Sequence, residues 1–130
     1  MTRAFSEIPA PTVLPDTKAY WEAAGEGRLL IKYCHDCRTY HFYPRSLCPF
    51  CFGDSTSWAE SGGMGVLYSF SAMSRTEPAL VLAFVTLDEG PTMMTNLVDC
   101  EVTELRIGQK VRVVYRESES GQPVPMFTPV

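Results

Sequence analysis

Two closely spaced pairs of cysteines constrain this chain more than any other feature of its sequence. Cys34 and Cys37 form one Cys-x-x-Cys pair, and Cys48 and Cys51 form a second pair after ten intervening residues. Four thiolates in two tight pairs are typical of tetrahedral zinc coordination, in which each pair forms a turn. Because thiolates fill all four coordination positions, water and substrate have no open position. We therefore predict one structural Zn²⁺ in a zinc ribbon.

The same cysteines allow three other interpretations. Two disulfides are disfavoured in a reducing compartment, and a redox-active Cys-x-x-Cys needs one pair rather than two. Rubredoxin-like iron also uses paired cysteine turns, although its pairs usually lie further apart in sequence. His35 and His41 are close to the pairs but are not needed as ligands, and the fifth cysteine, Cys100, is expected to be a small buried residue.

Composition and charge exclude several classes of protein. The chain has 130 residues and a formal net charge of −4, which is the wrong sign for a protein that binds a phosphate backbone. Its longest apolar run, Ala79 to Val85, is far shorter than the roughly 20 residues that a membrane span needs. The first 30 residues contain no apolar segment of the kind found in secretory signals. We expect a cytoplasmic protein with no membrane association.

The N-terminal part is expected to contain one short helix and one strand. Residues 1–14 are proline-rich and indicate an extended arm. Asp16 is placed to cap a helix that ends at Gly25 or Gly27, and Tyr20 and Trp21 lie at helical spacing within it. Alternating apolar residues over 29–33 then predict a strand that leads into the first cysteine pair.

From residue 66 onward the sequence predicts one strand after another. Residues 61–65 indicate a flexible glycine-rich joint, and residues 66–73, 80–87, 92–98 and 111–115 have the patterns of strands, with a last short strand near Phe127. Five strands with a break between the third and fourth suit a small OB-type barrel, and an SH3-like barrel is the alternative. The predicted fold is mainly β: arm and helix in 1–30, zinc ribbon in 31–60 and five-stranded OB-fold barrel in 61–130.

Taken in order, these motifs resemble a known family. The sequence from about Pro15 to Pro129 is similar to the acyl-CoA-associated zinc-ribbon/OB-fold proteins, a family of unknown function with a rubredoxin-like N-terminal ribbon. The motifs that carry this resemblance are Tyr20-Trp21, Gly27-Arg28-Leu29-Leu30, the two cysteine pairs, Phe42-Tyr43-Pro44-Arg45, Ser61-Gly62-Gly63-Met64-Gly65, Asn96-Leu97-Val98-Asp99-Cys100 and Pro125-Met126-Phe127. Two positions depart from the family pattern: Arg38 stands where glycine usually follows the second cysteine, and Phe52 delays the glycine after the fourth.

The resemblance implies a helper subunit rather than an enzyme. Family members accompany thiolase-like enzymes and are regarded as scaffolds or acyl-CoA-binding partners. The residues agree, because the sequence has no nucleophile elbow and no phosphate-binding glycine loop, and His41 with Cys100 is a poor candidate for a catalytic pair. The first alternative is a single-stranded nucleic-acid-binding module with Tyr68 and Phe70 as a stacking platform. The second is an iron-containing electron carrier.

Two further groups of residues are candidates for binding. A CoA thioester carries phosphates that need cations, and the available cations are Arg28, Lys32, Arg38, Arg45, Arg75 and Arg116. Tyr20 and Trp21 would form an unusual apolar patch if the helix exposed them, and such patches mark interfaces. We expect them to contact a thiolase-like subunit or a second copy of the chain. The alternative is that Trp21 packs between ribbon and barrel.

Overall fold

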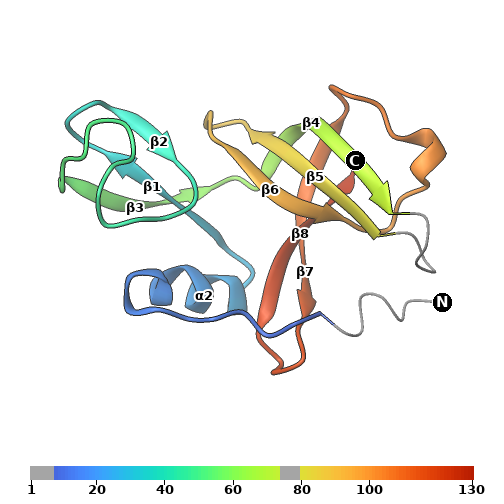
Figure 1. Cartoon of the computed structure of the whole chain (residues 1–130), viewed down its shortest axis with the longest axis horizontal. Coiled ribbons are helices and arrows are strands. Elements are labelled where there is room, and N and C mark those ends of the chain that lie inside the picture. The colour runs from blue at the N-terminus through green and yellow to red at the C-terminus, as the bar shows by residue number, and fades with distance from the viewer. Residues whose placement is uncertain (1–7, 74–79) are drawn as a thin grey trace.

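The structure, a computed structural model, describes residues 8–73 and 80–130. It contains a small three-stranded sheet of order β2-β1-β3 and a closed barrel of order β4-β5-β6-β8-β7. Figure 1 shows the two sheets side by side, with the helix α2 beside the small sheet and the strands β7 and β8. The mainly β fold that the sequence predicts is confirmed.

The helix begins later than predicted. A 3₁₀ turn, η1 (Pro15–Thr17), precedes the α-helix α2 (Lys18–Gly25), so Asp16 lies within the turn and is not the helix cap. Gly27 ends the helix with a φ of +76°, which glycine adopts without steric cost. The backbone N–H groups of Gly27 and Arg28 then donate to the carbonyl oxygens of Ala24 and Ala23, as in a Schellman motif.

The ribbon sheet consists of β1 (Leu29–Cys34), β2 (Thr39–His41) and β3 (Thr56–Ser61), and β1 pairs antiparallel with both neighbours. β1 confirms the strand expected over 29–33. It is buried almost throughout rather than on alternate residues. β3 is not among the strands that the sequence predicts, because Thr56–Ser61 carries no continuous apolar pattern. Its pairing with β1 holds it as a strand.

The barrel has the strand order of an OB fold. β6 and β8 pair in parallel and close the barrel, and the other strand pairs are antiparallel. The 3₁₀ turn η2 (Val102–Glu104) occupies the expected break between the third and fourth strands. The OB-type prediction is thus confirmed over the SH3-like alternative. The barrel strands are β4 (Met64–Met73), β5 (Leu80–Leu87), β6 (Thr92–Leu97), β7 (Lys110–Glu117) and β8 (Pro123–Pro129).

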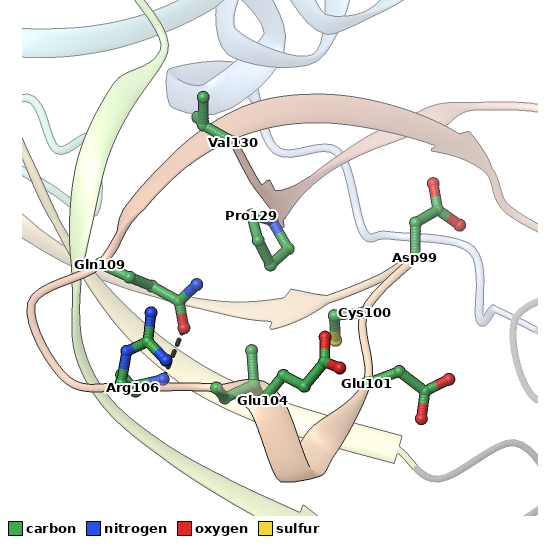
Figure 2. Close-up of a pocket in the computed structure, with 9 residues that line it drawn as sticks. Asp99, Cys100, Glu101, Glu104, Arg106, Gln109, Pro129 and Val130 are labelled. Atoms are coloured by element: carbon green, nitrogen blue, oxygen red, sulfur yellow. Dashed lines mark hydrogen bonds between the residues drawn. The ribbon is translucent and has the colours of Figure 1, made fainter.

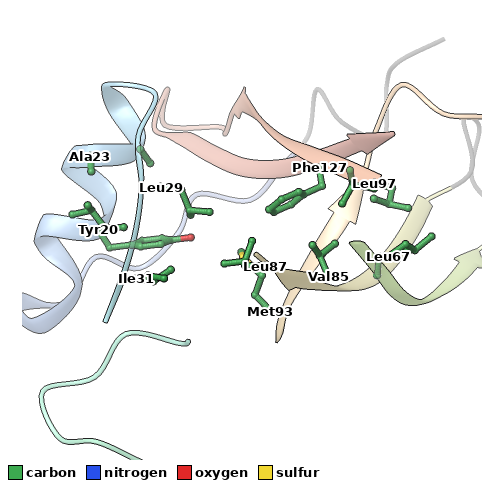
Figure 3. Packing of buried hydrophobic residues seen from close by; sticks show 14 of the residues in the cluster. Tyr20, Ala23, Leu29, Ile31, Leu67, Val85, Leu87, Met93, Leu97 and Phe127 are labelled. Atoms are coloured by element: carbon green, nitrogen blue, oxygen red, sulfur yellow. The ribbon is translucent and has the colours of Figure 1, made fainter. Parts of the chain in front are cut away.

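One hydrophobic core joins the helix, the ribbon and the barrel. It runs from Tyr20 of α2 through Leu29 and Ile31 of β1 to Leu87 and Phe127 of the barrel, as Figure 3 shows. Burial of such side chains is the main source of folding free energy. The ribbon and the barrel therefore stabilise each other through shared contacts.

Tyr20 and Trp21 are interior residues of this core. Their side chains are 4% and 9% exposed, so the apolar patch expected on the helix surface is not present. Their rings meet edge to face with centroids 4.9 Å apart, and the Gln122 side chain donates to the Trp21 carbonyl oxygen at 2.9 Å. Trp21 thus packs between parts of the chain, as the alternative interpretation held.

The glycine-rich segment between β3 and β4 is fixed rather than flexible. Glu89, in the turn after β5, accepts hydrogen bonds from the Ser61 hydroxyl at 2.8 Å and from the Gly62 N–H at 2.9 Å. The Ser61 oxygen also accepts from the Gly63 N–H. These bonds lock the direction in which the chain leaves the ribbon and enters the barrel.

Gly65 lies where β4 passes close to β5, and substitution there tests how close the two strands are. A Cβ at this position would lie 2.5 Å from the Thr86 carbonyl oxygen, whereas a Cβ at Gly62 would meet nothing closer than a Glu89 carboxylate oxygen at 3.9 Å. We expect Gly65→Val to lower the free energy of unfolding by about 1 to 3 kcal/mol through overpacking, and Gly62→Ala to leave it nearly unchanged. Denaturant unfolding of the two variants measures the difference. Equal stability would show that β4 does not pass so close to β5.

Candidate metal centre

The two cysteine pairs converge at the end of the ribbon sheet. The sulfur atoms of Cys34, Cys37, Cys48 and Cys51 all lie within 4.8 Å of one another. Cys34 closes β1, and the other three cysteines lie in the turns that follow β1 and β2. The Sγ atoms of Cys34 and Cys51 are 3.6 Å apart, as are those of Cys37 and Cys48.

These distances fit a tetrahedral zinc ion. A Zn–S bond of about 2.3 Å places neighbouring sulfurs of a tetrahedron about 3.8 Å apart, close to the separations found. Thiolates are ligands that zinc favours, and all four positions are supplied by the protein. The cysteine cluster is thus a site for one structural zinc ion.

Backbone N–H groups lower the cost of holding negative charge at Cys48. The Phe50 N–H donates to the Cys48 sulfur at 3.4 Å. Burial raises the pKa of Cys48, but hydrogen bonds from the backbone of Cys51 and Phe50 lower it by more. The pKa of Cys48 therefore falls to about 7. The thiolate that zinc requires therefore forms more easily at Cys48 than at a free cysteine.

The two departures from the family pattern occupy the strained positions of the cysteine turns. Arg38 has a φ of +56° and Phe52 a φ of +63°, and both lie in the left-handed region that favours glycine. Phe52 follows the fourth cysteine directly, and its N–H donates to the Cys48 carbonyl oxygen at 2.8 Å. The turn geometry is therefore preserved at the cost of backbone strain.

The six candidate cations differ in their exposure and in their ion pairs. Arg28 is paired with the carboxylates of Glu26 and Glu60, and Arg116 is paired with Asp99. Lys32 is 8% exposed, and its ammonium lies 4.3 Å from the centre of the Trp58 ring. Arg75 lies outside the described residues. Within the part of the chain that the structure describes, Arg38 and Arg45 remain exposed without an ion pair.

His41 and Cys100 do not form a pair. His41 is 1% exposed and lines a hollow between the ribbon and the β5–β6 turn. Burial lowers the pKa of His41, and the nearby backbone of Arg45 opposes this shift only in part. Neither ring nitrogen makes a hydrogen bond of normal geometry within the described residues. Cys100 lines a different hollow of about 780 Å³ (Figure 2), where Asp99, Glu101 and Glu104 are its acidic neighbours. The imaginable Cys/His catalytic pair is therefore not assembled.

A third hollow lies where the helix, the ribbon and the barrel meet, and the sequence analysis missed it. Its volume is about 570 Å³, and its lining is dominated by aromatic and methionine side chains. The residues come from α2, from the loop after β2, and from β5, β6 and β8, so no single segment signals it. We call it the junction hollow. Its lining includes Trp21, Phe42, Tyr43, Arg45, Phe84 and Met94.

The fold and the four-cysteine site define a protein made of a zinc ribbon and an OB-fold barrel. Residues 21–57 match the family model described as the rubredoxin-like zinc ribbon domain of ChsH2, and residues 58–116 match the model of the ChsH2 C-terminal OB-fold domain. The chain therefore belongs to the ChsH2-type zinc-ribbon/OB-fold family. A solved structure of this family carries the description DUF35.

A solved structure and two curated proteins are similar to this chain. The structure is described as the Ltp2-ChsH2(DUF35) aldolase; it has a TM-score of 0.80 and 30% identity, and the match covers 92% of this chain and 98% of that one. A probable enoyl-CoA hydratase alpha subunit of Thermomonospora curvata is 32% identical over 93% of this chain. A DUF35 domain-containing scaffold protein of Methanocaldococcus jannaschii is 30% identical over 64% of this chain. The chain spans 40% and 64% of the lengths of these two curated relatives.

Metal analysis tests the zinc assignment. Closed coordination by four thiolates predicts about one zinc per chain and a colourless protein. Cys34→Ser combined with Cys48→Ser removes one ligand from each pair, and we expect it to abolish zinc retention and to unfold the ribbon around residues 33–52, since zinc binding contributes directly to folding. The control is Cys100→Ser, which leaves the four ligands intact. Iron in place of zinc, seen as a red-brown colour with a charge-transfer band, would contradict the assignment.

Phe52 tests the strain in the second cysteine turn. Its side chain is 77% exposed, so Phe52→Gly removes little packing and relieves the positive φ. We expect a gain of about 1 kcal/mol in the free energy of unfolding of the zinc-loaded protein.

Phe50→Gly is the matched control. Phe50 is also exposed, at 64%, but its φ is not positive, so glycine there should destabilise by increasing the freedom of the unfolded chain. Thermal unfolding of both variants gives the comparison. Equal losses of stability would show that position 52 carries no strain.

Proposed function

We propose that this chain is a non-catalytic accessory subunit of a thiolase-like enzyme that acts on acyl-CoA thioesters. The observation that carries the proposal is the match over 98% of the chain in the structure described as the Ltp2-ChsH2(DUF35) aldolase. A match over nearly the full length of that chain supports the same use of the fold, as a subunit that accompanies an enzyme. The scaffold names of the archaeal relatives support the same function.

The arrangement of polar groups supports a non-catalytic role. The one cluster of metal-ligating side chains found in the described residues is the closed cysteine site, which leaves no position for a substrate. His41 and Cys100 line separate hollows. In the Thermomonospora relative, named a hydratase subunit, the part that this chain matches is 40% of the protein, so the rest can hold the catalytic groups.

Contact with the CoA moiety is the finer part of the proposal. Arg38 and Arg45 are the candidate cations that are exposed and unpaired within the described residues. Arg45 lines the junction hollow, so Arg38 is the better placed of the two to meet phosphates of a thioester bound by the partner. A cytoplasmic location is part of the same proposal. Among the described residues, no helix has the length and apolar character needed to cross a membrane.

Nucleic-acid binding is not favoured. Tyr68 is 64% exposed on the outer face of the barrel, but the net charge of −4 opposes binding to phosphate backbones. Two of the arginines are also neutralised by carboxylates.

Reconstitution tests the proposed function. The chain is co-expressed with the thiolase-fold protein encoded nearest to it, and the complex is isolated and assayed with a panel of acyl-CoA thioesters. We expect a stable complex, no turnover by this chain alone, and a rate at least tenfold higher for the complex than for the enzyme alone. The Cys34→Ser, Cys48→Ser double variant, whose ribbon we expect to unfold, tests whether binding needs a folded ribbon. Failure of the wild-type chain to bind the enzyme, or turnover by the isolated chain, would reject the proposal.

A further inference from the structure

We infer that the junction hollow and the barrel surface next to it are where the partner enzyme subunit docks, through an apolar segment of that subunit that carries a carboxylate. This inference rests on the proposed function and adds to it a location on this chain and a chemistry for the partner. The evidence lies in the lining of the hollow, its charge, and the exposed surface that continues from it.

The lining has the composition of the centre of a protein–protein interface. Aromatic residues, methionine and arginine are enriched at such centres, and this hollow contains all three. Tyr43 is 40% exposed at its edge, and Phe84 and Met94 are 41% and 59% exposed. Tyr20 and Trp21, which are almost fully buried, also line it.

The apolar surface continues from the hollow over the outer face of the barrel. Phe84 on β5 lies opposite Met94 on β6 in the strand register, and Leu82 is the next outward residue along β5. Tyr68 on β4 is exposed one residue before Ser69, which lies opposite Phe84. We call Leu82, Phe84, Met94 and Tyr68, together with the hollow, the junction face. An exposed apolar surface that spans three strands is larger than an isolated surface residue and marks an interaction site.

Charge determines what the junction face accepts. Arg45 is the one ionised side chain that lines the hollow, and no carboxylate among the described residues is within ion-pairing distance of it. An occupant with apolar side chains and one carboxylate would satisfy both the aromatic wall and the guanidinium. The expected partner segment therefore pairs a large apolar residue with Asp, Glu or a chain end.

A second copy of this chain fits the junction face less well. In a twofold dimer the same patch meets itself, so Arg45 would face residues of its own patch. The lining supplies no acidic side chain to pair with it. A different protein that brings the carboxylate is the better match.

Three variants and one control test the inference in the reconstituted complex. Met94→Lys and Phe84→Lys place a charge in the apolar centre, and we expect each to raise the dissociation constant at least tenfold. Arg45→Ala should raise the dissociation constant about three- to tenfold and reduce its dependence on salt. Ile107→Lys is the control, because Ile107 is 62% exposed in the turn before β7 and does not line the hollow; we expect less than a twofold change.

Protection of Met94 gives a readout that does not rely on substitution. In the wild-type complex, oxidation of Met94 by dilute peroxide should slow at least fivefold relative to the free chain, as measured by mass spectrometry. Folded variants that bind as tightly as wild type, or equal oxidation rates in the free and bound chain, would overturn the location while leaving the proposed function intact. Self-association that the Met94→Lys variant abolishes would assign the face to a second copy instead. If the wild-type chain binds no thiolase-fold subunit, the proposed function and this inference fail together.

Discussion

The hydrophobic core shared by β1, α2 and the barrel is the interaction on which the rest of this structure depends. Leu29 and Ile31 are almost fully buried in a core that also contains Phe127 at the other end of the chain. The same strand ends at Cys34, a ligand of the metal site. A short helix of eight residues is too short to be stable alone, so α2 also depends on this core through Tyr20 and Trp21. Zinc, helix and barrel are thus linked through one strand.

This linkage suits the proposed accessory role, because it gives the chain a fixed shape. The zinc ion fixes the ribbon, the Glu89 hydrogen bonds fix the passage from ribbon to barrel, and the core fixes the helix between them. The result is a rigid surface at the junction, which reduces the entropy lost when a partner binds. Arg45 lies three residues before Cys48, in the loop that leads to the metal site.

Much of this structure follows from local sequence patterns, and the rest follows from contacts between distant segments. The cysteine pairs, the alternation in β4 and the near-continuous apolar run of β5 are local signals, and the structure confirms the ribbon and the barrel that they predict. The strand β3 and the burial of Tyr20 depend on pairing and packing partners far along the chain, which no local pattern contains. The rigidity of Ser61 to Gly63 depends on Glu89, which lies 28 residues after Ser61 and 27 after Gly62. The junction hollow was missed for the same reason, because its walls come from five separate segments.

Hydrogen exchange measured by mass spectrometry, with and without zinc, tests most directly whether ribbon and barrel form one unit. If β1 links them as described, removing zinc should speed exchange in the ribbon and also in α2, β6 and β8, which share the core with β1. The strand pair farthest from the ribbon along the barrel should change least. Exchange in α2 and in every barrel strand that is the same with and without zinc would contradict the account, because the ribbon would then be an independent unit.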